Sequence, residues 1–188
     1  MAVPKLVIIL CGKRKSGKDY VAARLKEILA LGDSLSVLRL SKPLKEQFAK
    51  DHGLDLEKLM DSSSYKEKYR QDMITWSEMI RDKDPAYFCC LATEGADKPV
   101  WLVCDARRPS DMSYFKSKYN GRTLCVRVVA SEDVRVVRGW AFTAGVDDAP
   151  SECALDNYQV DMTIVNDDGD DLSQQLEAIR TKVKRTTT

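Results

Sequence analysis

A loop of the form G-x-x-x-x-G-K follows an apolar run near the start of the chain. The loop extends from Gly12 to Lys18, and Asp19 comes next. Glycines let such a backbone curl until its N–H groups point at phosphate oxygens, and a helix that follows directs its positive end at the same anion. Lys18 adds a mobile charge for the β- and γ-phosphates of a nucleotide. The pattern predicts binding of a nucleoside triphosphate.

The residues on either side of the loop fit this prediction. Residues 6–11 read as a buried strand, and apolar residues recur at helical spacing over residues 21–29. Asp19 stands where a serine or threonine usually binds Mg²⁺. A carboxylate is also a hard oxygen ligand, so Asp19 is a candidate metal ligand. An acidic residue in the first helical turn equally offsets the helix dipole, and both interpretations stay open.

A second carboxylate, Asp105, ends the apolar run 100–104. Phosphate-loop enzymes place the residue that holds Mg²⁺ through water at such a position, and beside the loop we favour this role over a simple cap. Arg107 and Arg108 follow, where the carboxyl ends of parallel strands open into a crevice. Their guanidinium forks suit an acceptor that bears phosphate or carboxylate, with a solvated basic turn as the alternative.

Residues 131–150 are polar and contain glycine. We interpret them as a mobile lid that would bring Arg135 and Arg138 to the transferring phosphoryl group and exclude water on closing. A helix with an exposed basic face, joined to a long loop, fits the spacing almost equally well. Asn166 follows the last apolar run and would contact the nucleotide or fix a turn.

Apolar runs alternate with stretches of helical spacing along the chain, which predicts an α/β layer fold with a mostly parallel, five-stranded sheet and flanking helices. The five runs are 6–11, 36–40, 100–104, 124–129 and 162–165. Residues 41–97 form a long insert whose main helix would carry one apolar face of Tyr65, Tyr69, Met73, Trp76 and Ile80. A last helix carries Leu172, Leu176, Ile179 and Val183.

A chain of 188 residues predicts one domain. Its 30 basic and 29 acidic residues nearly cancel, so the overall charge would not attract nucleic acid or an anionic membrane. The N-terminal residues do not read as a signal peptide, and the apolar run that follows is too short to span a bilayer, which predicts an intracellular, cytosolic protein. Six cysteines without metal-ligand spacing predict reduced and mostly buried thiols. The one histidine, His52, reads as a surface residue at a helix end and receives no role.

Among the classes that share the loop, a small-molecule kinase fits best. Asp105-Ala106-Arg107-Arg108 lacks the glycine of a GTPase switch, and a motor ATPase needs a larger chain. Lys45, Lys66, Arg70 and Arg81 lie on insert helices that would flank the crevice, although such spacing is ordinary for a solvated face. If the acceptor is a phosphate monoester, its second pKa of about 6 removes the need for a general base.

The chain then resembles a known family, the animal-type phosphomevalonate kinases, over nearly its full length. The aspartate after the loop is itself part of that family's pattern. The segments that carry the resemblance are Gly12–Asp19, Leu38–Ser41 with Pro43–Glu46, Tyr65–Lys66, Val103–Asp105 with Arg107–Arg108, Arg127–Ala130, Arg138–Trp140, Gly145–Asp148, Ser151–Cys153 and Leu155–Asn157. The resemblance implies the three-layer P-loop kinase fold of the nucleoside monophosphate kinases.

The resemblance implies transfer of the ATP γ-phosphoryl group to mevalonate 5-phosphate with the help of Mg²⁺, in isoprenoid, sterol and cholesterol synthesis. We separately expect a monomer. Catalytic roles fall on Lys18, Arg14, Lys15, Asp105 and Arg138. ATP binding falls on Gly12, Lys13, Arg14, Lys15, Ser16, Gly17, Lys18, Asp19, Arg138, Asn166 and Asp167, with Asp19 and Asp105 on the metal. Acceptor binding falls on Lys66, Arg70, Arg81, Arg107, Arg108, Arg127, Arg135 and Asn166. Cys90 and Asp167 depart from the basic or imidazole side chains expected in relatives.

Two other functions stay open. A nucleoside monophosphate kinase shares the loop, the lid and the architecture, but it must grip a base in the acceptor pocket. A nucleotide-gated binding module would close on ATP without turnover. Association with peroxisomes is also left open by the sequence.

Overall fold

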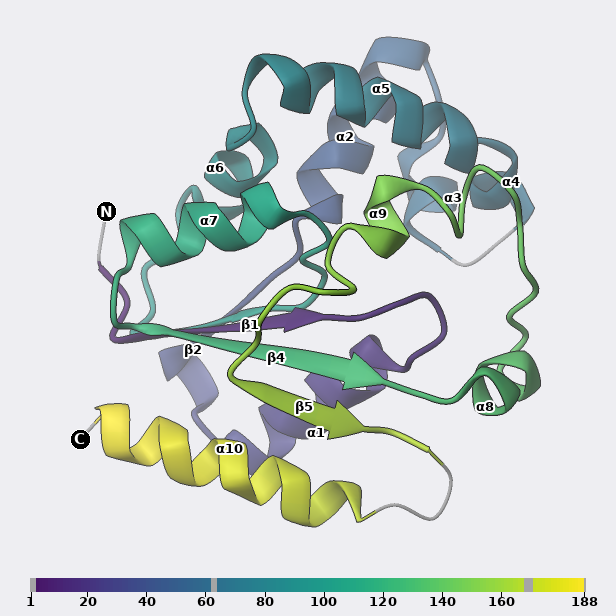
Figure 1. The fold of residues 1–188 in the computed structure, drawn as a ribbon. Helices are drawn as coiled ribbons and strands as arrows, with labels where there is room; N and C mark the ends of the chain where they lie inside the picture. Colours follow the sequence, from purple (N-terminus) through teal and green to yellow (C-terminus); the bar gives the residue numbers. More distant parts are fainter. Residues whose placement is uncertain (1–2, 62–63, 168–170, 188) are drawn as a thin grey trace.

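Five strands form a parallel sheet in the computed structural model, which describes residues 3–61, 64–167 and 171–187. Their order across the sheet is β2-β3-β1-β4-β5. The strands are β1 Leu6–Cys11, β2 Leu35–Leu38, β3 Val100–Val103, β4 Thr123–Val129 and β5 Met162–Val165. All five predicted strands are confirmed, and their carboxyl ends meet at one edge of the sheet (Figure 1).

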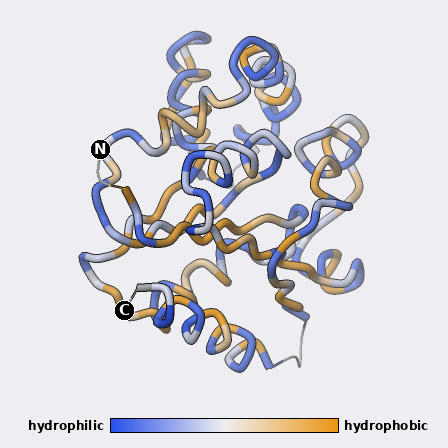
Figure 2. The backbone as a smooth tube through the Cα atoms, turned by 60° about the vertical axis from the view of Figure 1, so that its left-hand side comes forward, coloured by the Kyte–Doolittle hydropathy of each residue, from blue (hydrophilic) through white to orange (hydrophobic). Residues whose placement is uncertain are grey.

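The two faces of the sheet bury separate apolar cores. Along β1, Ile8 and Leu10 belong to one core, and Val7 and Ile9 belong to the other. Successive strand residues point to opposite faces, so a strand covered on both sides must be apolar throughout. Every residue of β1 and β3 is buried. Figure 2 shows the hydrophobic backbone segments gathered in the strands at the centre of the molecule.

Helices cover both faces and so complete the three predicted layers (Figure 1). Helices α1 (Lys18–Leu29) and α10 (Leu172–Thr187) pack on the first core through Val21, Leu25, Leu176, Ile179 and Val183. The predicted last helix is therefore confirmed. Helices α6 (Tyr87–Thr93) and α7 (Pro109–Lys118) pack on the second core through Cys89, Met112 and Phe115.

The insert is helical, as predicted, and has a small core of its own. Helices α2 (Ser41–His52), α3 (Leu56–Met60), α4 (Ser64–Lys68) and α5 (Arg70–Lys83) surround Phe48, Ala49, Leu59 and Met73. The prediction of one continuous helix from Tyr65 to Ile80 is wrong, because the helix breaks at Tyr69. The N–H of Tyr69 donates to the carbonyl of Lys66 at 3.2 Å, a tighter turn that still keeps Tyr65 beside Tyr69. Apolar spacing does not distinguish such a turn from an α-turn.

The segment after β4 contains a helix at each end of a long loop. Helix α8 spans Glu132–Val137, and α9 spans Pro150–Cys153. A short 3₁₀ helix, η1 (Gly32–Ser34), precedes β2. Figure 1 places α8 beyond the carboxyl end of β4 and α9 above the sheet on the side of the insert. These helices therefore lie at the edge where the loops that follow the strands converge.

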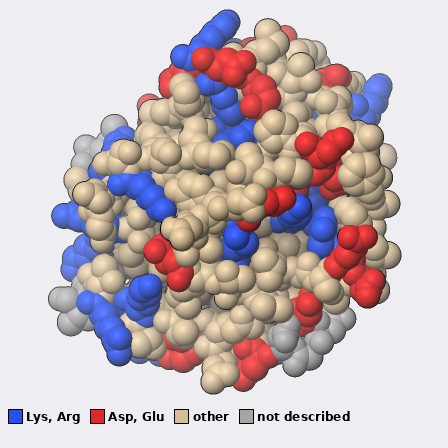
Figure 3. Space-filling view, in the orientation of Figure 1, with Lys and Arg blue, Asp and Glu red and all other residues tan. Residues whose placement is uncertain are grey.

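Charged residues are mixed on the surface, and the thiols are free. Figure 3 shows basic and acidic side chains interspersed on the face that it draws. All six cysteines are free, and Cys11, Cys89, Cys104 and Cys125 are buried, as predicted. His52 is the exposed last residue of α2, and its ring Nδ1 lies 2.9 Å from the carbonyl of Phe48. Within the described ranges, we find no helix with both the length and the apolar character that a bilayer crossing requires.

Candidate active site

The loop between β1 and α1 is folded tightly and depends on two glycines. Gly12 has φ +144° and Gly17 has φ +86°, values that L side chains rarely adopt. A Cβ atom on Gly12 would lie 2.2 Å from the carbonyl oxygen of Val128, and one on Gly17 would lie 2.1 Å from Nδ2 of Asn166. The backbone can take this course only with glycine at both positions. Gly17 is also the N-cap of α1, so the loop ends at the positive end of that helix.

Lys18 lies inside the curve of this loop. Its Nζ donates to the carbonyl oxygens of Gly12 at 2.5 Å and of Lys13 at 2.9 Å. Burial lowers the pKa of Lys18 to about 7, and the charge of Arg107 is the second cause. The charges of Glu152, Asp19 and Asp105 raise this pKa only in part, so the buried cation gains free energy when an anion binds. The predicted position of Lys18 in the loop is thus one that favours phosphate.

The far end of the loop is held by Asn166 and Arg138. Asn166 is buried, and its Nδ2 donates to the carbonyl of Ser16 at 2.9 Å. Arg138 donates to the carbonyls of Asn166 at 2.7 Å and of Ser16 at 3.4 Å. Asn166, which was expected to contact the nucleotide or to fix a turn, therefore holds the end of the phosphate-binding loop in place. The hydroxyl of Ser16 is buried without a hydrogen-bond partner among the described residues.

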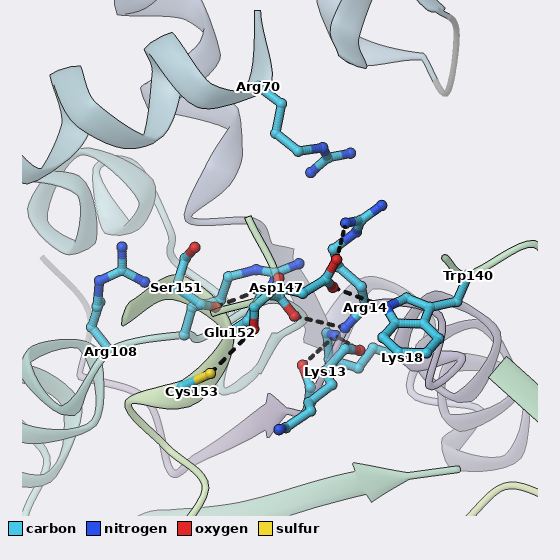
Figure 4. A network of polar contacts seen from close by, with 12 residues as sticks. Lys13, Arg14, Lys18, Arg70, Arg108, Trp140, Asp147, Ser151, Glu152 and Cys153 are labelled. Atoms are coloured by element: carbon cyan, nitrogen blue, oxygen red, sulfur yellow. Dashed lines mark hydrogen bonds and ion pairs between the residues drawn. The ribbon is translucent and has the colours of Figure 1, made fainter. Parts of the chain in front are cut away.

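Arg14 connects the loop with the segment after β4. Its backbone N–H donates to Oε2 of Glu152 at 2.7 Å, and its guanidinium donates to Oδ2 of Asp147 at 2.8 Å. Arg135 of α8 donates to the carbonyl of Arg14 at 2.9 Å and stacks on the ring of Trp140 at 4.1 Å. Figure 4 shows Asp147, Glu152 and Trp140 gathered around Arg14. Residues 131–153 thus lie against the loop.

Three neighbouring cavities open around these residues. The loop cavity, about 470 Å³, has nine basic and three acidic side chains in its lining. The insert cavity, about 160 Å³, lies between the insert and the strand ends, and the strand cavity, about 280 Å³, lies against the first half of the loop and the end of β4. So many cations in one concave region predict a ligand with several negative charges.

The arginines near the insert are held by carboxylates. Arg107 pairs with Glu152, and Arg108 pairs with Glu78 of α5. Arg81 pairs with Asp111 at 2.7 Å. Arg108 is buried, and this burial lowers its pKa from the ordinary value. These pairs fix the direction of guanidinium groups that would otherwise be long and mobile side chains.

Lysines of the insert also face the cavities. Burial lowers the pKa of Lys45 to about 8, with the charge of Lys66 as the second cause. Burial is also the main cause that lowers the pKa of Lys66, and the charge of Arg70 is the second cause. Both lysines line the insert cavity and the loop cavity. Burial first, and then the nearby positive charges, thus lower both pKa values, and an anion that binds here would offset both effects.

The two carboxylates expected to bind a metal line the same loop cavity. Asp19 is 77% exposed and pairs with Arg39 through Oδ1 at 2.6 Å. Asp105 accepts from the backbone N–H groups of Leu40 at 2.7 Å and Ser41 at 3.1 Å, so it caps the start of α2. The part of the chain that the structure describes holds no cluster of three or more metal-binding side chains. Two carboxylates fit Mg²⁺, because Mg²⁺ is usually held by one or two carboxylates together with phosphates and water.

The structure brings most of the predicted site residues together around three cavities that share Arg107. The loop cavity is lined by Arg14, Lys15, Gly17, Lys18, Asp19, Lys66, Arg70, Asp105, Arg107 and Arg138. The insert cavity is lined by Lys66, Arg70, Arg81, Asp105, Arg107 and Arg108. The strand cavity is lined by Gly12, Lys13, Ser16, Arg107, Arg127 and Arg135.

Some predicted site residues lie apart from the other members of their group, and Arg127 and Arg135 of the acceptor group line the strand cavity. Arg127 faces the strand cavity, not the insert, and donates to the carbonyls of Leu155 at 2.5 Å and Tyr158 at 2.6 Å. Asn166 and Asp167 are absent from the linings of these three cavities. Asp167 accepts from the N–H of Ser131 at 2.7 Å and so joins the loop after β5 to the start of α8.

Sequence reasoning did not assign the carboxylates that hold the arginines. Glu152 and Asp147 lie in segments that carry the family resemblance, but neither received a role. Glu78 is one of many charged residues on an insert helix. One sequence feature could have pointed to Glu152. Pro150 favours the first position of a helix, and Glu152 then lies in the first turn of α9.

Comparison with known proteins gives a consistent result. A family model described as phosphomevalonate kinase matches residues 10–121. A protein of Drosophila melanogaster named phosphomevalonate kinase is 40% identical over 174 residues, which cover 90% of this chain and 91% of that protein.

Solved structures share the fold at low sequence identity. The APS kinase CysC of Mycobacterium tuberculosis, in complex with AMPPNP and APS, superposes with a TM-score of 0.57 at 13% identity and covers 98% of this chain and 99% of its own. The protein TT1252 of Thermus thermophilus superposes with a TM-score of 0.54 at 17% identity and covers 98% of each chain. The likeness to the APS kinase confirms the predicted P-loop kinase fold.

Proposed function

The chain belongs to the phosphomevalonate kinase family, and we propose that its cavities bring ATP and mevalonate 5-phosphate together. The reaction breaks the bond between the γ-phosphorus of ATP and its bridging oxygen. A phosphate oxygen of mevalonate 5-phosphate forms the new bond, and the products are mevalonate 5-diphosphate and ADP. The observation that carries this proposal is the pair of basic cavities that share Lys45, Lys66, Arg70 and Arg107.

The loop cavity suits the triphosphate of ATP. Lys18 would exchange its two carbonyl acceptors, 2.5 and 2.9 Å away, for β- and γ-phosphate oxygens. Arg14, Lys15 and Arg138 line the same cavity and would neutralise charge that spreads over the phosphoryl oxygens. The hydrogen bonds of Asn166 and Arg138 keep the end of the loop in place while phosphate binds.

The insert cavity suits the acceptor. Arg81, Arg108, Lys66 and Arg70 provide cations for a phosphate and a carboxylate. Apolar side chains from the insert and from the segment after β4 would contact the carbon skeleton, and these are Leu44, Met73, Ile74 and Val146. The described lining of this cavity includes no aromatic ring on which a nucleobase would stack, which favours mevalonate 5-phosphate over a nucleoside monophosphate.

The acceptor phosphate requires no general base. Its second pKa is about 6, so the oxygen that attacks is already deprotonated at neutral pH. The protein's task is to hold two polyanions in line and to neutralise their repulsion. Arg107 lines both cavities and is therefore placed to contact the phosphoryl group that passes between them.

Asp19 and Asp105 would hold Mg²⁺ together with the phosphates of ATP. The ion, when bound, would neutralise part of the negative charge of the triphosphate. Asp19 would need to exchange Arg39 for the ion or for a water ligand. Asp105 already accepts two backbone N–H groups, which orient its carboxylate at the end of β3.

Other predictions follow from the sequence and stay predictions. Residues 131–150 would act as a lid, and their contacts with Arg14 provide the closing interactions. A single domain, a monomeric state, a cytosolic location and a place in sterol and cholesterol synthesis are proposed on the same basis. The acceptor role of Arg127 also stays a prediction, now with the strand cavity as its position.

A coupled assay of ADP release from Mg-ATP tests the proposed function. The acceptors are mevalonate 5-phosphate, AMP, UMP and dTMP, with a control that has no acceptor. We expect turnover with mevalonate 5-phosphate alone. Turnover with a nucleotide instead would establish a nucleoside monophosphate kinase. Tight ATP binding without ADP formation on any acceptor would establish a binding module.

A further inference from the structure

Arg107 occupies the junction of the three cavities. It follows β3 at the carboxyl edge of the sheet, and among the described residues it alone lines the loop cavity, the insert cavity and the strand cavity. Its charge is the second cause of the low pKa of Lys18, which indicates that the two cations lie close together. The orientation of this one side chain therefore affects both substrates.

Glu152 determines that orientation. It lies on α9, its side chain is 4% exposed, and its Oε1 accepts from Nη1 of Arg107. Its Oε2 accepts from the backbone N–H of Arg14 at 2.7 Å. The carbonyl of the neighbouring Ser151 also accepts from Nη1 of Arg107, at 3.3 Å. In Figure 4, Glu152 lies between Ser151 and Arg14, so one short helix connects the phosphate-binding loop with the arginine at the junction.

The pairing uses one edge of the guanidinium group. Among the described contacts of the Arg107 side chain, all hydrogen bonds involve Nη1, so Nε and Nη2 remain for a phosphoryl oxygen. A buried carboxylate is costly unless it is paired and fully hydrogen-bonded, and both oxygens of Glu152 have partners. The pair thus reduces the freedom of Arg107 before a substrate binds, and ordering a catalytic group in advance lowers the barrier of the chemical step.

We propose that Glu152 is a positioning residue for phosphoryl transfer, which acts by holding Arg107 at the boundary between the two substrates and the N–H of Arg14 in the loop. Its contribution is orientation, and it does not itself contact the transferring group. This inference rests on the proposed function of the same cavities.

The first test is the variant Glu152→Gln, compared with Glu177→Gln as a matched control. Glutamine keeps an oxygen for the Arg14 N–H, but it loses the charge and faces Arg107 with either a neutral oxygen or a donor. We expect kcat to fall about 10- to 100-fold, with the KM values of both substrates changed less than about threefold, since a small misplacement of a catalytic group has this effect. Glu177 pairs with Arg180 on the exposed face of α10, and its variant should keep wild-type kcat and KM.

A double-mutant cycle separates positioning from a merely structural role. The cycle compares the wild type, Glu152→Gln, Arg107→Ala and the double variant that carries both substitutions. If Glu152 acts through Arg107, Glu152→Gln lowers kcat in the wild-type background but changes it less than about twofold in the Arg107→Ala background. Equal losses in both backgrounds, or an increase in kcat for Glu152→Gln, would overturn the proposal. Thermal unfolding of each variant confirms that the cycle compares folded proteins.

The proposed acceptor can fail independently of this inference. If the wild-type protein phosphorylates a nucleoside monophosphate and not mevalonate 5-phosphate, the acceptor assignment is wrong, and the same cycle is then measured with that nucleotide. Coupling between Glu152 and Arg107 with the new acceptor would still support positioning. Additive losses would contradict it, whichever acceptor the protein uses.

Discussion

The guanidinium group of Arg14 lies 2.8 Å from the carboxylate of Asp147, and the two side chains are 15% and 6% exposed. Asp147 also accepts from the indole N–H of Trp140 at 2.9 Å and from the backbone N–H of Thr143 at 2.9 Å. One carboxylate therefore organises the loop between α8 and α9 and attaches it to the phosphate-binding loop. If this segment opens as a lid, the motion would break a nearly buried ion pair, which costs more free energy than breaking an exposed pair.

Asp147→Asn should weaken ATP binding. The amide keeps some of the hydrogen bonds but loses the charge that holds Arg14, so we expect the KM for ATP to rise about tenfold, the equivalent of one charge-assisted hydrogen bond. Steady-state kinetics gives the KM, and hydrogen exchange should show faster exchange over residues 138–149. The control is Asp133→Asn, an exposed carboxylate on α8. An unchanged KM for ATP would show that this ion pair has no part in nucleotide binding.

Lys18→Met should abolish most turnover while the protein stays folded. The variant removes the cation at the β- and γ-phosphates, and loss of one such electrostatic contact lowers kcat about 100- to 1,000-fold. Burial that lowers the pKa of Lys18 to about 7 also makes the charged side chain costly, so its removal should not reduce the melting temperature greatly. Lys26→Met, on the exposed face of the same helix, should behave like the wild type. A Lys18 variant that keeps most of its activity would remove this residue from the mechanism.

Arg108→Ala should affect the acceptor and not ATP. Arg108 lines the insert cavity and is absent from the lining of the loop cavity. We expect the KM for mevalonate 5-phosphate to rise about 10- to 100-fold, as for loss of a hydrogen-bonded charge pair, with the Kd for ATP unchanged in direct titration. Its partner Glu78 is 32% exposed and can be solvated, which limits the cost to stability. Arg24→Ala on α1 is the control, and an unchanged acceptor KM would contradict the assignment.

The sequence predicted the contiguous features of this protein well. Buried parallel strands read as uninterrupted apolar runs, so β1 and β3 were placed within a residue or two of their observed ends. The phosphate-binding loop is also contiguous, and the spacing of Gly12, Gly17 and Lys18 predicts its conformation and its affinity for phosphate. Parallel strands then bring the residues after each carboxyl end together, which is why Asp105 and Arg107 were expected beside the loop.

Pairings between distant segments were not predictable in the same way. Arg107 and Glu152 are 45 positions apart, and Arg14 and Asp147 are 133 apart. Whether a basic residue faces a ligand or a carboxylate depends on the path of the irregular segment 138–149, for which periodicity gives no information. The break at Tyr69 was missed for a related reason, since a tight turn preserves the apolar face.

Lys45 should give the reaction an alkaline limit near pH 8. Its pKa is lowered to about 8 by burial and then by the charge of Lys66, so the side chain is positive below about pH 8 and neutral above it. Smaller effects come from the charges of Asp105, which raises the pKa, and of Arg39 and Arg70, which lower it. Because the acceptor phosphate becomes a dianion above a pKa of about 6, kcat/KM for the acceptor should rise through pH 6 and fall above pH 8.

The variant Lys45→Arg assigns the alkaline limb of this profile. A guanidinium group stays protonated across the measured range, so kcat/KM for the acceptor should no longer fall between pH 8 and about pH 9.5. Lys50→Arg, at an exposed position on the same helix, should keep the wild-type profile. The profile is measured at saturating Mg-ATP, where Lys18, whose pKa is about 7 without ligand, is already paired with the triphosphate. Under this condition kcat/KM for the acceptor reports the pKa values of the enzyme–ATP complex and of the free acceptor. If the fall above pH 8 persists in Lys45→Arg, another group causes it, and Lys45 does not supply a charge that the acceptor requires.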